Sequence, residues 1–392
     1  MKRILIIPSW FKDAKSPSAG TFFEEEAYLM SQAYYVSLFV MERYWTDTEF
    51  KPEDSFSMIE EKGVTKFVVR YPQWHNKTIE ENLKIQYAYA DSALNKIVMQ
   101  HNAKWDLIHA YATFPAGCIS RRFSEILNVP YLITEHFGPF CPDFAHSIFV
   151  KRSIIEALEN ANVVLSVSSH LRQQILMQNI NCNPTVVGNF VNNRIFTLGS
   201  VGIHSPVQLL TVAYYPSYIK DIDNLLSALE ILRDKKVAFH LTLIGGGELK
   251  GGFIKNNTLI SKVESYHLQQ NVTVIGSCSR KNMVQYMKNC DIYVSSSIAE
   301  TFGVCIGEAM LCGKPVVLTK NGGSEDFANI NNSLVVEVHN PQQLAEGIMR
   351  VIKRYETYDS HLIRKSILSR YGAASFLRRI SNIYEDALKV KK

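Results

Sequence analysis

Residues 295–315 read SSSIAETFGVCIGEAMLCGKP and contain two glutamates, Glu300 and Glu308, that lie eight positions apart. A strand pattern precedes this segment and ends at its first residue. A helical pattern begins after Thr301, a suitable N-cap residue, and Gly313, followed by a lysine and a proline, predicts its end. Another buried strand pattern follows directly. This succession of strand, helix and strand favours an α/β fold with parallel strands.

The two glutamates flank a predicted helix N-terminus. Glu300 lies in the loop before the helix, and Glu308 lies roughly two turns into it. The first turn contains Gly303 and no carboxylate, so its free backbone N–H groups and the helix dipole favour an anion such as phosphate. Carboxylates on either side can accept hydrogen bonds from hydroxyls, and an anion with hydroxyls describes a nucleotide sugar. In the alternative interpretation, both glutamates are solvated and the helix only packs.

The segment resembles the E-x7-E signature of the retaining glycosyltransferases of family four, also called group 1, which have the GT-B fold. Residues 271–281 resemble the family's loop that holds the nucleotide base, residues 243–248 its Gly-x-Gly turn, and residues 322–326 its later Gly-Gly turn. The similarity is strong over residues 207–340 and weaker over the N-terminal half. It implies an α/β protein with two Rossmann-like domains whose parallel sheets face each other across a cleft.

The domain organisation is predicted from the length of the chain and from the alternation of strand and helix patterns. A chain of 392 residues is long enough for two domains, and strand and helix patterns alternate along it until residues 198–206 interrupt them. We therefore place a boundary near residue 200. The resemblance assigns residues 1–200 to acceptor binding and residues 201–373 to the nucleotide sugar. It also implies that residues 374–392 form a last helix that packs back on the first domain.

Composition indicates a soluble globular protein. Hydrophobic residues make up 46% and charged residues 20%, and a net charge of +5 does not suggest a nucleic-acid partner. The seven cysteines lack metal-binding spacing, and their odd number argues against a full disulfide framework, so we expect a reducing cytoplasm. The apolar run near Met1 is too short for a secretory signal and predicts a strand. No stretch is long and apolar enough for a transmembrane helix.

Positive charge is needed where a nucleoside diphosphate leaves the sugar. Lys220, which precedes a predicted helix, is a candidate in addition to the helix N-terminus. The family has an arginine five or six residues before this lysine, where this chain has Tyr215 and Tyr214. Either another cation substitutes, with Arg280 and Lys281 as candidates, or the phosphate site is weaker. Without the resemblance, Lys220 would be interpreted as an exposed loop lysine.

The N-terminal half supplies further candidates. Gly20 follows the first strand and would let the backbone approach a ligand, although an ordinary turn is the alternative. His136 follows a buried strand at its C-terminal end, where parallel sheets bind ligands, and matches the family's histidine near the reacting sugar. A structural histidine is the alternative. His109 and Tyr111, at the end of the neighbouring strand, are candidates for acceptor binding.

The resemblance implies a role for each residue. Glu308 would hold the ribose hydroxyls and Glu300 the hydroxyls of the donor sugar, with a covalent nucleophile as a second, weaker role for Glu300. The glycosidic bond formed would keep the anomeric configuration of the donor, and neither a metal nor a cofactor would be required. The candidate catalytic residues are Glu300, His136 and Lys220, and the candidate donor-binding residues are Gly20, Arg280, Thr301, Phe302, Gly303, Val304 and Glu308.

The acceptor is less defined. Family members extend glycans or polyprenyl-linked glycans in cell-surface polysaccharide and lipopolysaccharide synthesis, and uridine is their commonest base. Aromatic residues within 137–149 and basic pairs at 121–122 and 151–152 suggest a peripheral contact with the anionic inner face of the membrane. A solvated helix face is the alternative.

Three other functions were compatible with parts of the pattern. A sugar-nucleotide 2-epimerase shares the GT-B architecture, and a non-catalytic binding relative would explain the missing arginine. A dinucleotide oxidoreductase is suggested only by the glycines at 245–247, which lack the full fingerprint spacing. The acidic pair Asp221 and Asp223 resembles a metal-binding string, but its position at a helix start favours capping.

Overall fold

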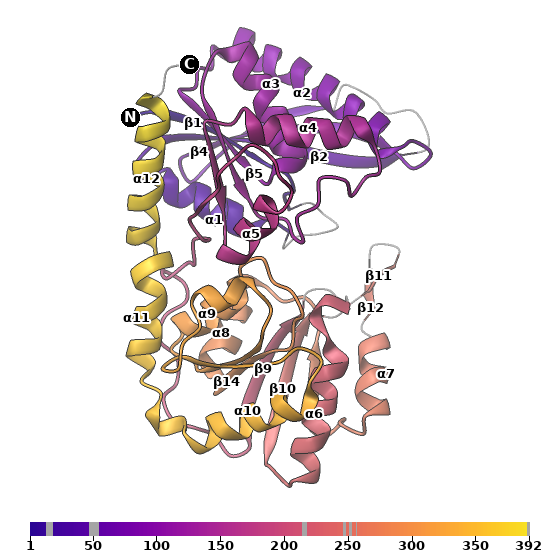
Figure 1. The fold of residues 1–392 in the computed structure, drawn as a ribbon, viewed down its shortest axis with the longest axis vertical. Coiled ribbons are helices and arrows are strands. Elements are labelled where there is room, and N and C mark those ends of the chain that lie inside the picture. The colour runs from indigo at the N-terminus through magenta and orange to yellow at the C-terminus, as the bar shows by residue number, and fades with distance from the viewer. Residues whose placement is uncertain are drawn as a thin grey trace. The chain divides into compact units, whose positions relative to one another are not determined.

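The computed structural model describes residues 1–12, 19–46, 55–213, 218–245, 248–250, 253–255 and 257–389, with the backbone alone at residues 248–250, 253–255 and 257–258. Tyr214 and Tyr215, which replace the family's arginine, lie outside these residues. The chain divides into two compact units, each with one large sheet (Figure 1). Unit 1 comprises Met1–Gly188 and Phe376–Lys392, and unit 2 comprises Asn189–Ser375. The division after Gly188 precedes the glycine-containing stretch that suggested a boundary near residue 200.

The sheet of unit 1 has the strand order β3-β4-β2-β1-β5-β6-β7-β8. Its neighbouring strands are parallel except for β3 and β4, which form an antiparallel hairpin that the sequence did not predict. The hairpin turn places Lys62 and Gly63 at φ values of 51° and 76°, as a tight two-residue turn requires. The strands are β1 (Arg3–Pro8), β2 (Tyr35–Thr46), β3 (Phe56–Glu61), β4 (Val64–Trp74), β5 (Leu107–Tyr111), β6 (Tyr131–Glu135), β7 (Val163–Ser166) and β8 (Thr185–Val186).

Apolar helix faces complete the core of unit 1. In α12, Phe376, Ile380 and Tyr384 are buried at helical spacing, whereas the intervening positions are more exposed. The start of α2 is fixed by a reciprocal capping box between Thr78 and Glu81. The helices are α1 (Thr21–Met30), α2 (Ile79–His101), η2 (Thr113–Gly117), α3 (Cys118–Leu127), α4 (Ile148–Glu159), α5 (Ser169–Leu176) and α12 (Ala373–Lys389).

Unit 2 contains a parallel sheet in the order β13-β10-β9-β14-β15-β16. Its strands are β9 (Val207–Ala213), β10 (Phe239–Gly245), β13 (Val272–Ile275), β14 (Ile292–Ser295), β15 (Val316–Thr319) and β16 (Ser333–Val336). A separate antiparallel pair is formed by β11 (Glu248–Lys250) and β12 (Phe253–Lys255). The helices are η3 (Tyr218–Lys220), α6 (Ile222–Asp234), α7 (Asn257–Ser265), α8 (Arg280–Asn289), α9 (Val304–Leu311), η4 (Gly323–Asp326), α10 (Pro341–Lys353), η5 (Tyr355–Thr357) and α11 (Ser360–Tyr371).

Helix α9 begins two residues later than the sequence predicted. Its N-cap is Gly303, at a φ of 87°, and not Thr301. Glu308 is therefore the fifth residue of the helix and lies just over one turn from its start, instead of two. The predicted end of the helix is confirmed, since Gly313 follows it at a φ of 78°.

Candidate functional site

Two loops of unit 2 bring Lys220 and Glu300 together. Lys220 ends η3, after β9, and Glu300 follows β14, which is hydrogen-bonded to β9 in the sheet. The Lys220 Nζ atom lies 2.5 Å from Glu300 Oε1. Burial alone would lower the pKa of Lys220, but the charge of Glu300 and its hydrogen bond raise it, so the lysine stays protonated.

The Glu300 carboxylate is held from a second side. Ser297 donates a hydrogen bond from its hydroxyl to Glu300 Oε1 at 2.8 Å. Thr319, on β15, donates in turn to the carbonyl oxygen of Ser297. Sequence reasoning missed both residues, although the run of serines before Glu300 marked a polar strand end. These contacts restrict the carboxylate to one orientation before any ligand binds.

The backbone of Glu300 is fixed by the loop after β15. Its N–H donates to the carbonyl oxygen of Asn321 at 2.8 Å, and its own carbonyl accepts from the N–H of Gly323 at 3.0 Å. A Cβ atom on Gly323 would lie 2.4 Å from the carbonyl carbon and oxygen of Thr301. Only glycine allows this approach of the two chains, which explains the Gly-Gly turn that the sequence singled out.

Glu308 is paired with Arg280, the first residue of α8. The Nη1 atom of Arg280 lies 2.7 Å from Glu308 Oε1, and the guanidinium lies over the ring of Phe196 at 4.9 Å from its centroid. The Glu308 side chain is 1% exposed, whereas that of Arg280 is 33% exposed. Arg280 is therefore more accessible to solvent and to ligands than Glu308.

The N-terminus of α9 lies between the two glutamates in sequence. No side chain caps it, and its first turn contains no acidic residue, so its positive end is not neutralised locally. Val304 and Cys305 of this turn are partly exposed, whereas Phe302 is buried against Phe327 and Tyr371. Phe302 can thus contribute its backbone to a site, but not its side chain. Burial raises the pKa of the Cys305 thiol to about 12, so this cysteine is not a thiolate.

The acidic pair before α6 has other partners. Asp221 pairs with His339 at 2.7 Å, and Asp223 pairs with Lys262 at 2.6 Å. Asp221 occupies the N-cap position but forms no capping hydrogen bond through its side chain. The two carboxylates therefore point to different basic residues, and the capping role predicted for Asp221 was wrong.

In unit 1, His109 and Tyr111 lie in the interior. Both are 0% exposed. The ring nitrogens of His109 lie 2.7 Å from the hydroxyls of Tyr384 and Thr134, and Tyr111 donates to Glu26 at 2.6 Å. Burial lowers the pKa of His109, which keeps its ring neutral. The expected contact of these two residues with an acceptor has no counterpart in this arrangement, because neither side chain reaches a surface.

His136 is also largely buried, at 6% exposure, and packs against the rings of Phe22, Phe23 and Tyr111. Gly20 is the N-cap of α1 with a φ of 64°. A Cβ atom at this position would lie 2.9 Å from the carbonyl oxygen of Trp10. Gly20 therefore allows a close approach to the loop after β1, whereas an approach of its backbone to a ligand stays a prediction.

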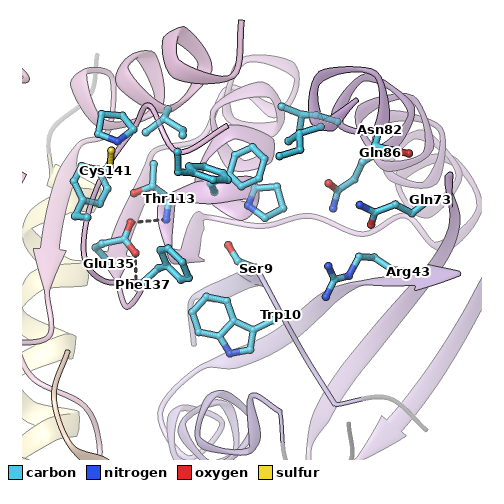
Figure 2. Close-up of a pocket in the computed structure, with 18 of the residues that line it drawn as sticks. Ser9, Trp10, Arg43, Gln73, Asn82, Gln86, Thr113, Glu135, Phe137 and Cys141 are labelled. Atoms are coloured by element: carbon cyan, nitrogen blue, oxygen red, sulfur yellow. Dashed lines mark hydrogen bonds between the residues drawn. The ribbon is translucent and has the colours of Figure 1, made fainter. Parts of the chain in front are cut away.

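A pocket in unit 1 is lined by aromatic residues of the segment 137–149 together with residues that the sequence did not single out (Figure 2). Its volume is about 260 Å³. Glu135 is at its wall, 1% exposed, and its carboxylate accepts the backbone N–H groups of Thr113, His136 and Phe137 at 2.7–2.9 Å. The pocket lies beside the loop that follows β1 and the loop that follows β6, at the C-terminal ends of these parallel strands.

Known proteins are similar to this chain in sequence and in fold. Residues 202–365 match the family Glycosyl transferases group 1. An uncharacterized glycosyltransferase of Methanocaldococcus jannaschii is 30% identical over 255 residues, which are 64% of this chain and 66% of that protein. The N-acetyl-alpha-D-glucosaminyl L-malate synthase of Bacillus anthracis is 20% identical over 338 residues, which are 82% of this chain and 86% of that protein.

Solved structures of other proteins superpose on this structure over nearly the whole chain. The sucrose-phosphate synthase of Thermosynechococcus elongatus superposes with a TM-score of 0.77 at 17% identity, covering 98% of this chain and 99% of that one. The HepE protein of Anabaena, solved in complex with UDP, gives a TM-score of 0.72 at 18% identity, covering 98% and 100%. At such identities the likeness establishes the fold.

The two sheets, parallel except at β3, and these structural likenesses define the GT-B fold. Within that fold, the family match and the E-x7-E segment show that the chain belongs to the group 1 glycosyltransferases, the retaining enzymes of family four that use nucleotide-sugar donors.

Proposed function

We propose that this protein transfers a sugar from a nucleoside diphosphate sugar, with UDP as the first candidate carrier, to a glycan or lipid-linked glycan. The observation that carries the proposal is a pair of ion pairs, Lys220 with Glu300 and Arg280 with Glu308, whose two carboxylates flank the uncapped N-terminus of α9. Each pair couples a cation suited to phosphate with a carboxylate suited to hydroxyls. A nucleotide sugar presents both kinds of group.

The cations would act on the leaving group. Negative charge grows on the diphosphate as its bond to the sugar breaks, and fixed positive charge lowers the energy of that state. Lys220, kept protonated by Glu300, and the N-terminus of α9 supply such charge without a metal ion. Arg280 takes the place of the arginine that the family has before Lys220. This division of roles supports a metal-independent reaction.

The carboxylates would bind hydroxyls. Glu300 is 18% exposed and would accept hydrogen bonds from the donor sugar. Glu308 is nearly inaccessible behind Arg280, so ribose hydroxyls would reach it as the guanidinium moves from the carboxylate to a phosphate. Exchange of one charged partner for another avoids leaving either group buried and unpaired.

The donor site is tested by thermal unfolding of the protein with UDP, GDP, ADP and CMP. A nucleotide at 100 times its dissociation constant adds about 2.7 kcal/mol of stability. We expect one nucleoside diphosphate to raise the melting temperature, and Glu308→Gln to remove the effect. Glu346→Gln, at an exposed position of α10, is the matched control and should respond like the unchanged protein. No response to any nucleotide would count against the donor site.

The stereochemistry is tested on the product. We expect the new glycosidic bond to keep the anomeric configuration of the donor, which NMR coupling constants report directly. An inverted product would contradict the assignment. Turnover of the donor sugar that needs no acceptor and yields an epimer would instead favour a sugar-nucleotide 2-epimerase.

A membrane contact would bring a lipid-linked acceptor within reach. In the part of the chain that the structure describes, no helix combines the length and apolar character that a membrane crossing requires. Phe137, Phe144 and Ile148 of unit 1 are nevertheless 57%, 42% and 88% exposed. Lys151 and Arg152 follow on α4 with side chains that are 45% and 78% exposed. We place this surface against the anionic inner face of a membrane.

Sedimentation with vesicles tests this contact. Binding to vesicles containing anionic lipid at low salt should fall when Ile148 is changed to Asp, and it should weaken as salt screens the basic residues. Ile260→Asp, an exposed apolar position in unit 2, is the control. Equal binding to neutral and anionic vesicles would contradict the electrostatic part of the proposal.

A further inference from the structure

The pocket of unit 1 has two chemically different ends (Figure 2). Glu135 and Thr113 lie at one end, and Arg43, Gln73 and Gln86 lie at the other, with Ser9 and Trp10 between them. The pocket-lining residues include one cation, Arg43, and one anion, Glu135. The negative charge of Glu135 is already bound by three backbone N–H groups. The positive charge at the opposite end is not matched in this way.

Arg43 has no carboxylate partner among the described residues. It lies on the extended part of β2, where the neighbouring basic residue Arg70 is paired with Glu42 at 2.8 Å. The two arginines thus differ, because one is neutralised by an acid and the other lines a cavity. A guanidinium presents a planar set of donors that matches a carboxylate or a phosphate.

Two amides lie beside this cation with polar atoms that bond to none of the described residues. Gln86, on α2, is 6% exposed and hydrogen-bonds to no other described residue. The Oε1 atom of Gln73 is buried and also has no partner among these residues. Buried polar groups in folded proteins are ordinarily hydrogen-bonded, so amides placed at a cavity wall are poised to bind what enters it. By contrast, the buried amide of Asn82 bonds to the backbone at Trp74, Lys77 and Thr78 and is structural.

The remaining wall is aromatic. Trp10, Phe114, Phe137, Phe140 and Phe144 line the cavity, and Phe114 packs edge-on against Phe144 at a centroid distance of 5.2 Å. Pyranose rings have apolar C–H faces that pack on such rings, while their hydroxyls bond to amides, hydroxyls and carboxylates. A cavity of about 260 Å³ suits the terminal sugar of an acceptor more than a long segment of it.

We propose that this pocket binds the acceptor through a terminal sugar that carries an anionic group, with Arg43 and Gln86 holding the anion and Glu135 facing the hydroxyls. The proposal rests on the transferase function above, because it assigns the second substrate of the same reaction. The anion is a carboxylate, as in a uronic acid, or a phosphate ester, and both present the same oxygen donors to a guanidinium.

Calorimetric titration of the full chain distinguishes these possibilities. The probes are methyl β-glucuronide, glucose 6-phosphate and the neutral methyl β-glucoside. We expect one or both anionic sugars to bind about tenfold more tightly than the glucoside, since a charged hydrogen bond is worth about that factor. Arg43→Gln should reduce the binding of the anionic sugars to that of the glucoside, and Gln86→Leu should weaken it in part. Arg70→Gln is the matched control and should bind like the unchanged protein.

Each result has a defined meaning. Preference for the glucuronide identifies a uronic acid, and preference for glucose 6-phosphate identifies a phosphate ester. Equal binding of all three probes, insensitivity to Arg43→Gln, or no binding of any probe would overturn the proposal. Thermal stabilisation by a nucleoside diphosphate is measured on the same samples and reports on the donor site separately. Loss of that signal with anion binding intact would overturn the transferase function, and the reverse would overturn the acceptor class alone.

Discussion

Lys220 and Glu300 are separated by 80 positions in the chain, yet their side chains form a 2.5 Å ion pair at the ends of two adjacent strands. The backbones of the two loops are also joined, because Ile298 donates to the carbonyl oxygen of Ile219 at 2.8 Å. The lysine and the carboxylate are therefore ordered by the fold before a donor binds. Such preorganisation limits the rearrangement needed to reach the transition state.

Removing the cation should slow the chemical step. We expect Lys220→Met to lower kcat by about 10²- to 10³-fold, as the loss of one charge-stabilising donor does in other enzymes. The melting temperature should change little, because the ion pair is partly exposed. Lys262→Met, which removes an exposed lysine paired with Asp223 in the same unit, is the control. A kcat that is equal in both variants would show that Lys220 does not act on the leaving group.

The turn beside Glu300 should not tolerate a methyl group. Gly323→Ala places its Cβ against the backbone of Thr301, so we expect a loss of about 1–3 kcal/mol in the free energy of unfolding, together with loss of turnover. Gly202→Ala is the comparison, since Gly202 has a φ of 96° but nothing within 4 Å of its Cβ position. That variant has backbone strain without a clash and should keep its turnover. Denaturant titrations and donor turnover measure both effects.

Glu26 should make the protein less stable as the pH rises. Burial raises the pKa of Glu26 to about 8, although the hydrogen bond from Tyr111 acts in the opposite direction. The unfolded chain loses its proton near the ordinary value of 4.5, whereas the folded chain keeps it until about pH 8. The contribution of Glu26 to the free energy of unfolding is therefore fully present below pH 4.5 and declines as the pH rises through about pH 8, by roughly 5 kcal/mol in total.

Glu26→Gln should remove this decline, because the amide can still accept the hydrogen bond from Tyr111 but does not ionise. Urea unfolding at pH 5, 6, 7 and 8 measures it. Glu24→Gln serves as the opposite case: burial would raise the pKa of Glu24, but hydrogen bonds from Lys66 and Lys12 lower it overall. Glu24→Gln should be less stable than the unchanged protein above pH 4.5, and its stability should still decrease with rising pH because Glu26 is present. Equal pH dependence for Glu26→Gln and the unchanged protein would contradict the assignment.

The hydroxyl of Tyr384 should contribute to the stability of unit 1. Tyr384→Phe leaves the buried Nδ1 atom of His109 without its partner at 2.7 Å, so we expect a cost of about 1–3 kcal/mol. Tyr266→Phe removes a longer, exposed contact with Asp223 and should be nearly neutral. Thermal and urea unfolding of the two variants provide the comparison. Equal stabilities would indicate that the histidine finds another partner.

The second unit was the more predictable part of the chain. The alternation of strands and helices there, and the glycine after α9, are local signals that the tertiary structure retains. The start of α9 shifted because Gly303, which adopts a positive φ, replaced the better capping residue Thr301. The β3–β4 hairpin was missed because β3 is largely exposed on its outer face and has no strong apolar alternation.

Site residues in the first unit were harder to predict. Position at the end of a parallel strand pointed to the edge of the sheet where the pocket lies, but it did not give the depth of each side chain. His109 is covered because Tyr384, 275 positions later, bonds to it. The pocket is also lined by residues from three separate elements, β2, β4 and α2, which contribute Arg43, Gln73 and Gln86. No local sequence pattern therefore predicts that they line one cavity.

The division of the chain also bears on its synthesis. Unit 2 is continuous, from Asn189 to Ser375, whereas unit 1 needs Phe376–Lys392 in addition to its first 188 residues. As the nascent chain leaves the ribosome, all residues of unit 2 are synthesised before unit 1 has received Phe376–Lys392. Until translation has passed Tyr384, the hydroxyl that will bond to His109 has not been made. Residues 1–188 therefore cannot complete their unit until α12 has been synthesised, and during that interval we expect them to be a substrate for chaperones that bind incomplete chains.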